Sequence, residues 1–98
     1  MNMNVIKNLK CNAKAKISYE VPKSGDFVAL WEFGGVPYSA TYRWKNNELL
    51  VCDDFGIFYQ PGYDRVADYL DLSGLVDMVS GYTECQLIAF VSIDVEAA

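Results

Sequence analysis

The chain has 98 residues, of which 52% are hydrophobic, and its formal net charge is −5. A chain of this length can bury one two-layer core, so we expect a single domain over residues 1–98. There is no histidine and no CxxC motif, which excludes histidine-based acid–base catalysis and a structural zinc site. The three cysteines are an odd number and widely spaced, which disfavours a disulfide framework. Cysteine usage and the lack of a leader or a membrane-length apolar run lead us to expect a cytoplasmic protein.

Strand signals dominate the first sixty residues. Residues 13–21 alternate strictly between apolar and polar side chains, which predicts a strand whose odd-numbered residues share one face. The polar face carries Lys14 and Lys16, which are typical of an edge strand protected against unwanted pairing. Residues 27–33 are almost entirely apolar on both faces, so we expect a covered central strand with Trp31 in the core.

Four further strands are predicted by the same patterns. Residues 38–44 alternate, and a turn at 45–47 leads from them into the apolar run at 48–52. The two asparagines of that turn tolerate the positive φ angles that a tight hairpin needs. A short strand is expected at 57–59, and the apolar, β-branched run at 85–95 predicts a long buried strand.

The spacing of apolar residues becomes helical after Pro61. Asp64 is the expected N-cap, and Ser73-Gly74 interrupts the pattern, so we predict a broken helix at about 63–80 packed on one face of the sheet. The fold class is therefore α+β, a single domain with a mainly antiparallel sheet of four to six strands. The patterns leave the order of the strands open.

Residues 54–56 spell Asp-Phe-Gly, the tripeptide that holds magnesium in protein kinases. That machinery also needs a glycine-rich loop, a strand lysine paired with a helix glutamate, and a catalytic-loop aspartate. This chain has no such set of motifs and is too short for two lobes. We interpret the tripeptide as local turn chemistry between two apolar runs.

Acidic residues gather in the second half of the chain. Asp64, Asp68 and Asp71 lie at i, i+4 and i+7, so a helix would place their carboxylates along one stripe. Together with Asp53 and Asp54 they form either an acidic patch that meets a basic partner or only a solvated face that keeps the protein monodisperse. Their spacing does not match a calcium loop, so we expect no metal site.

Aromatic residues lie beside these acids. Tyr59 and Tyr63 flank a predicted loop, where tyrosine typically anchors an interface or rims a pocket. An acidic and aromatic surface also suits a cationic small ligand. Five lysines lie within residues 1–25, but the chain is acidic overall and has no arginine cluster, which disfavours nucleic-acid binding.

We therefore expect a non-enzymatic module without a cofactor that binds a basic surface of another protein and contacts neither nucleic acid nor membrane directly. The alternative is a small cationic-ligand-binding protein with an acidic–aromatic pocket. Small acidic domains without a catalytic motif are typical of accessory proteins of phages and mobile elements, some of which inhibit enzymes by occupying basic clefts. An unpaired sheet edge also predicts a homodimer. The expected partner-binding residues are Asp53, Asp54, Tyr59, Tyr63, Asp64, Asp68 and Asp71.

Overall fold

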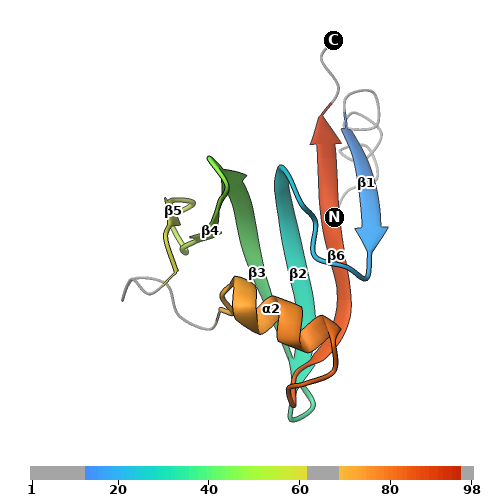
Figure 1. Ribbon diagram of the computed structural model, residues 1–98. Helices are drawn as coiled ribbons and strands as arrows, with labels where there is room; N and C mark the ends of the chain where they lie inside the picture. The colour runs from blue at the N-terminus through green and yellow to red at the C-terminus, as the bar shows by residue number, and fades with distance from the viewer. Residues whose placement is uncertain (1–12, 62–68, 96–98) are drawn as a thin grey trace.

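The computed structural model describes residues 13–61 and 69–95. Within them, six antiparallel strands form one open sheet, and a short helix packs on one of its faces (Figure 1). The elements are β1 (Ala13–Ser18), β2 (Asp26–Phe33), β3 (Val36–Lys45), β4 (Glu48–Cys52), β5 (Phe58–Tyr59), α2 (Leu72–Val79) and β6 (Gln86–Val95). The strand order is β1-β6-β2-β3-β4-β5, so β1 and β5 are the edges. Self-association through either edge stays a prediction.

Two-residue turns join the central strands. β2 meets β3 at Gly34-Gly35, and β3 meets β4 at Asn46-Asn47. All four residues have positive φ angles, between 51° and 79°. Positive φ at both central residues is the hairpin geometry whose twist matches that of the flanking strands. The predicted asparagine hairpin is therefore confirmed.

The first strand is shorter than predicted. The Ser18 hydroxyl donates to the carbonyl of Glu20 and accepts a hydrogen bond from the Glu20 N–H, which bends the chain and ends β1. Ile17 pairs with Val91 on the face that points away from α2, whereas Val21 packs against the core. Because the chain bends after Ser18, the prediction that all odd residues of 13–21 share one face is wrong. The predicted position of β1 at an edge of the sheet is confirmed.

The helix also differs from the predicted broken helix at 63–80. Ser73 and Gly74 lie in the first turn of α2 and do not interrupt it. Asp71 is the N-cap, because its Oδ1 accepts a hydrogen bond of 2.8 Å from the Gly74 N–H. First-turn N–H groups have no partner inside a helix, so a side-chain cap makes a helix start at these residues favourable. Residues 69–70 are not helical, and the rest of the predicted first half lies outside the described residues.

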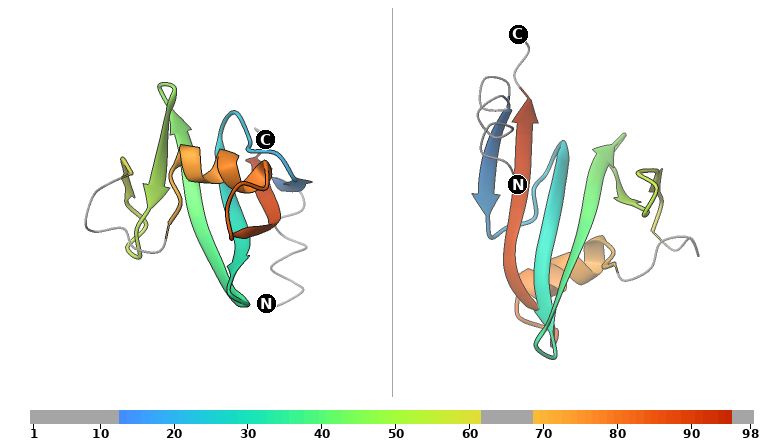
Figure 2. Two further views of the ribbon diagram at one scale, coloured as in Figure 1. Left: turned by 60° about the horizontal axis from the view of Figure 1, so that its bottom comes forward. Right: turned by 180° about the vertical axis from the view of Figure 1, so that it is seen from behind.

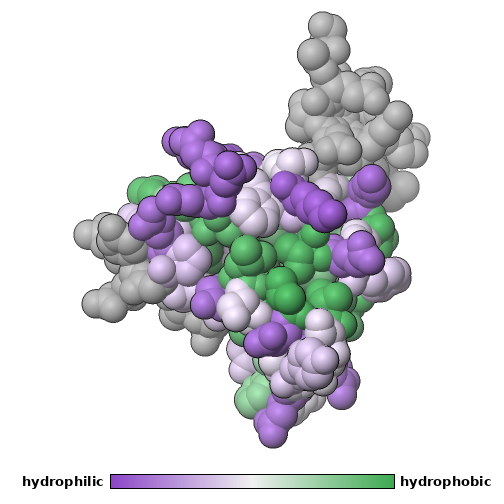
Figure 3. Space-filling view, in the orientation of Figure 1, coloured by the Kyte–Doolittle hydropathy of each residue, from purple (hydrophilic) through white to green (hydrophobic). Residues whose placement is uncertain are grey.

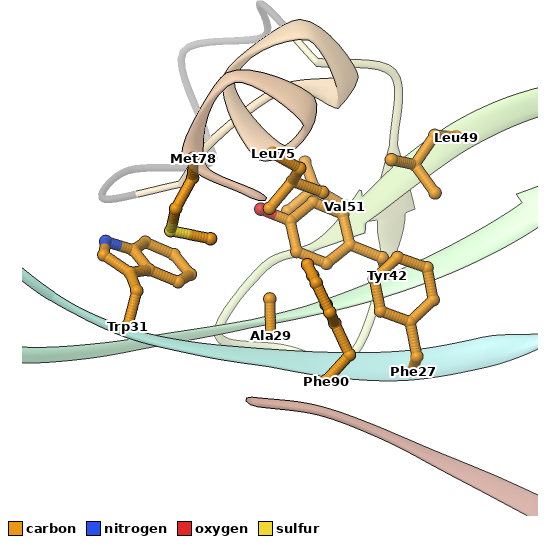
Figure 4. Packing of buried hydrophobic residues seen from close by; sticks show 9 residues of the cluster. All are labelled: Phe27, Ala29, Trp31, Tyr42, Leu49, Val51, Leu75, Met78 and Phe90. Carbon is orange, nitrogen blue, oxygen red and sulfur yellow. The ribbon is translucent and has the colours of Figure 1, made fainter. Parts of the chain in front are cut away.

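The core lies between α2 and one face of the sheet. Leu75 and Met78 point from α2 toward the strands (Figure 4). The Phe27 ring stacks on Tyr42 with a centroid distance of 5.2 Å and meets Phe90 edge-on at 5.8 Å. Trp31 is 3% exposed, which confirms its predicted place in the core. The buried cluster consists of Phe27, Ala29, Trp31, Tyr42, Leu49, Val51, Leu75, Met78 and Phe90.

Candidate functional site

The structure distributes the predicted partner-binding residues over two separate hollows. Asp53, Asp54 and Tyr59 line a hollow of about 370 Å³ at the turn between β4 and β5. We call residues 53–57 the hairpin tip and this hollow the tip hollow. Asp71 lines a second hollow of about 410 Å³ at the start of α2, which we call the groove. Outside the described residues lie Tyr63, Asp64 and Asp68.

The carboxylate of Asp53 holds the hairpin tip together. Its Oδ1 accepts hydrogen bonds from the Phe55 N–H and the Ile57 N–H, both at 2.9 Å. The Asp53 N–H donates to the Ile57 carbonyl at 2.8 Å, and the Gly56 N–H donates to the Asp53 carbonyl at 3.2 Å. Gly56 has a φ of 81°, which residues with a side chain rarely adopt. Asp53 therefore shapes the tip, while Asp54 is exposed at its surface.

The hairpin tip exposes two large apolar side chains. Phe55 is 87% exposed, Ile57 is also exposed, and both line the tip hollow beside the carboxylates. A large aromatic side chain held in water by an ordered turn is typical of an interface anchor. The sequence interpretation missed both residues because it explained Asp-Phe-Gly by turn formation alone. The sequence did contain a signal for the exposure of Phe55, because this apolar residue stands between the turn-forming residues Asp54 and Gly56.

Tyr59 forms a wall of the tip hollow and also belongs to the body of the protein. It pairs with Val51, so its side chain lies on the face of the sheet that α2 covers. There it packs against the buried cluster while it lines the tip hollow. Its half-buried ring gives the hollow an aromatic wall of fixed position.

The groove lies between the β3–β4 turn and the start of α2. The Glu48 carboxylate at the groove accepts a hydrogen bond of 2.9 Å from the Gln60 side-chain amide. Asp71 is fixed by its cap hydrogen bond, so both carboxylates are held in place beside an apolar lining. That apolar lining comes from Trp44, Leu49, Pro61 and Leu72.

A buried hydroxyl group fixes the segment that leads into α2. The Tyr42 hydroxyl donates to the Leu70 carbonyl at 2.6 Å and accepts from the Leu70 N–H at 3.1 Å. Burial raises the pKa of Tyr42 well above its usual value, so the phenol stays neutral and serves as donor and acceptor. This contact with β3 sets where Asp71 lies relative to the groove.

The Cys52 thiol lies next to the hairpin tip, at the end of β4. Burial, and then the negative charge of Asp53, raise the pKa of the Cys52 thiol, and a protonated thiol is a weak nucleophile. Within residues 13–61 and 69–95, no three histidine, cysteine or acidic side chains gather closely enough to hold a metal ion. Carboxylates beside exposed apolar and aromatic groups form a surface that can attract a cation and bury a hydrophobic contact.

In the part of the chain that the structure describes, no helix has the length and apolar character needed to cross a bilayer. The sequence matches no family model, no curated protein and no solved structure.

Proposed function

We propose that this protein is a non-enzymatic module that binds a basic surface of another protein through the hairpin tip. The observation that supports this most strongly is the 87% exposure of Phe55 beside two carboxylates, those of Asp53 and Asp54. Burying a phenylalanine against a partner contributes about 1.5–3 kcal/mol, and the carboxylates favour a cationic surface around that contact.

The residues of the tip have different roles in this proposal. Phe55 and Ile57 are the apolar anchors, so their truncation should raise the dissociation rate. Asp54 attracts the partner during its approach, so its charge should act on the association rate and lose influence as salt rises. Asp53 is a positioning residue, because its carboxylate is engaged in the turn that presents Phe55.

The test is a quantitative pull-down from an extract of the source cells with four baits. They are the parent protein, Phe55→Ala, Asp54→Lys and a matched control, Tyr82→Ala, which removes an aromatic ring of 82% exposure from the turn after α2. We expect one protein of the extract to be retained equally by the parent and by Tyr82→Ala, and to be lost from Phe55→Ala. The association of that protein with Asp54→Lys should be slower than its association with the parent. If no protein distinguishes the parent from Phe55→Ala, the tip is not the binding site.

The identity of the retained protein would then decide the biological role. An enzyme that acts on nucleic acid through a basic cleft would support the role of an accessory or inhibitor protein. The charge reversal belongs at Asp54 and not at Asp71, because Asp71 caps α2 and its loss would also destabilise the fold.

A second candidate function is the binding of a small cationic ligand in the tip hollow. Its volume of about 370 Å³ suits a small molecule, and it combines two carboxylates with the aromatic rings of Phe55 and Tyr59. Titration with tetramethylammonium, followed by amide NMR shifts, tests this function. It predicts saturable shifts confined to residues 53–59; shifts that do not saturate, or that spread over all acidic segments, would exclude a specific site.

A further inference from the structure

One flank of α2, next to its core-facing side, carries an exposed apolar stripe. Leu72, Val76 and Val79 lie at i, i+4 and i+7, and they are 38%, 47% and 37% exposed. The inner side of the same helix contributes Leu75 and Met78 to the core. A surface helix usually has one apolar side and one polar side, so α2 is apolar on more of its circumference than the core requires.

This stripe belongs to a larger hydrophobic area. Figure 3 shows hydrophobic surface in the middle of the face that α2 covers, bordered by hydrophilic side chains. Leu72 lies at the start of the stripe and also lines the groove, together with Leu49 and Trp44. The stripe and the groove therefore adjoin each other at Leu72, and we call the two together the α2 surface.

The charges around the α2 surface are mainly acidic, and Lys45, a cation beside them, pairs with Glu48 next to the β3–β4 turn. Residues 46–61, which supply most of the groove, and residues 69–95, which include α2, contain no lysine or arginine. Carboxylates lie at the groove, on Glu48 and Asp71, and on the helix itself at Asp77. Two copies of this surface would repel each other, whereas a partner with positive charges around an apolar stripe would be attracted.

We propose that the α2 surface is a docking site for a basic amphipathic helix of a partner protein. Such a helix would lie along α2 and bury its apolar side against Leu72, Val76 and Val79. A lysine or arginine of the partner would extend its aliphatic stem over the groove and place its charge beside Glu48 and Asp71. This site is separate from the hairpin tip, so the proposal does not depend on the tip being an interface.

Two synthetic peptides of about 14 residues serve as probes, long enough at ~1.5 Å per residue to cover α2 and reach the groove. One has leucines on one side and lysines on the other, and the second replaces every lysine with glutamate. Binding is measured from the fluorescence anisotropy of labelled peptide. We expect the leucine/lysine peptide to bind with an affinity that falls as salt rises from about 50 to 300 mM, and the leucine/glutamate peptide not to bind.

The decisive variant is Val76→Ser combined with Val79→Ser, which removes the stripe without changing charge. Valine and serine have similar helix propensities, so the fold should persist, as circular dichroism would verify. The matched control is Ile17→Ser, at a side chain of 64% exposure on the opposite face of the sheet. We expect about tenfold weaker binding by the double variant and no change for Ile17→Ser. If the double variant does not fold, Val79→Ser alone, in the last turn of α2, replaces it.

Three results would overturn the proposal. The leucine/lysine peptide fails to bind, the leucine/glutamate peptide binds equally well, or the serine variant binds within about twofold of the parent, which is less than ~0.5 kcal/mol. The last result would mean that the lysines meet acidic residues elsewhere. Phe55→Ala should leave peptide binding unchanged, so failure of the α2 surface and failure of the hairpin tip are distinguishable.

Discussion

The two faces of the sheet differ in how completely they bury their side chains. On β2, the residues that face α2, namely Phe27, Ala29 and Trp31, are at most 3% exposed. Val28 and Leu30, on the opposite face of the same strand, are only half-buried. The right panel of Figure 2 shows the sheet from that opposite side, with α2 behind it. A strand that is apolar on both faces therefore has one face in the core and one that is only partly shielded.

Polar contacts connect strands on the opposite face. The Arg43 guanidinium donates to both carboxylate oxygens of Asp26 at 2.8 and 2.9 Å, and its central carbon lies 4.0 Å from the centroid of the Phe58 ring. These contacts link β2, β3 and β5 across the sheet. Exposed ion pairs contribute little to folding, so we infer that stability is concentrated on the α2 side and that the opposite face tolerates substitution.

The largest expected effect is that of Trp31→Ala, on the α2 side. Removing this buried ring should cost about 3–5 kcal/mol in the free energy of unfolding, enough to unfold a marginal domain. The matched control is Leu30→Ala, one residue away on the opposite face, which should cost only about 1–2 kcal/mol because its side chain is half-buried. Urea titrations measure both. Equal costs would break the comparison, because they would show that the opposite face is as fully covered as the core, for example by a second copy of the chain.

Tyr42→Phe should have the next largest effect. The substitution keeps the ring in the core but removes the hydroxyl that satisfies both backbone groups of Leu70. Leaving a half-buried N–H and carbonyl without partners should cost about 1–3 kcal/mol. Tyr82→Phe, at an exposed tyrosine, is the control and should be neutral. A neutral Tyr42→Phe would mean that water replaces the hydroxyl and that this contact does not hold the approach to α2.

Local patterns predicted the parts of this fold that depend on neighbouring residues. Asparagine at both positions of the β3–β4 turn was sufficient to predict the hairpin, because few other residues tolerate its φ angles. The apolar run around Trp31 predicted a core strand, and the position of β1 at an edge agreed with its lysine-bearing face. Each of these inferences used a property that acts within a few residues.

The features that were missed depend on contacts between distant residues. β6 inserts between β1 and β2, which no local pattern encodes. The start of α2 was placed wrongly because Ser73-Gly74 resembles a helix breaker, whereas the Asp71 cap and the contact from Tyr42 make it a first turn. Phe55 was overlooked as a site residue because exposure depends on where the whole β4–β5 turn points.

Asp71→Ala should have a smaller effect on the α2 side. It removes the N-cap of α2, which typically costs about 1 kcal/mol, and it should leave the Trp31 side of the core intact. Asp77→Ala is the matched control, since it removes an acid from the interior of the same helix and should be neutral or slightly stabilising. Amide hydrogen exchange should show faster exchange at residues 73–75 in Asp71→Ala only. Equal effects of the two substitutions would mean that charge, and not capping, is responsible.

Asp26→Asn removes the negative charge and one of the two acceptor oxygens from the polar contact on the opposite face, and we expect the smallest loss of stability. The hydrogen bond from Arg43 holds the pKa of the Asp26 carboxyl below its usual value of 3.8. Because the folded-state pKa is lowered, the carboxylate stabilises the fold above the unfolded-state pKa, and this contribution is lost as pH falls through the lowered pKa. Both side chains are close to half exposed, so solvent and salt reduce the effect further.

The measurement is therefore a pair of urea titrations for Asp26→Asn and the parent, one near neutral pH and one in acid below about pH 4. Near neutral pH, the difference in the free energy of unfolding between Asp26→Asn and the parent should be smaller than the loss caused by Asp71→Ala. This difference should decrease in acid, and it should also decrease when salt is added at neutral pH. Asp54→Asn, which removes an exposed carboxylate from the hairpin tip, controls for the change in net charge. A loss of stability in Asp26→Asn that exceeds the effect of the lost cap would show that the opposite face contributes as much to stability as the cap of α2 does. A loss that is unchanged in acid would show that it does not come from the charge of the Asp26 carboxylate.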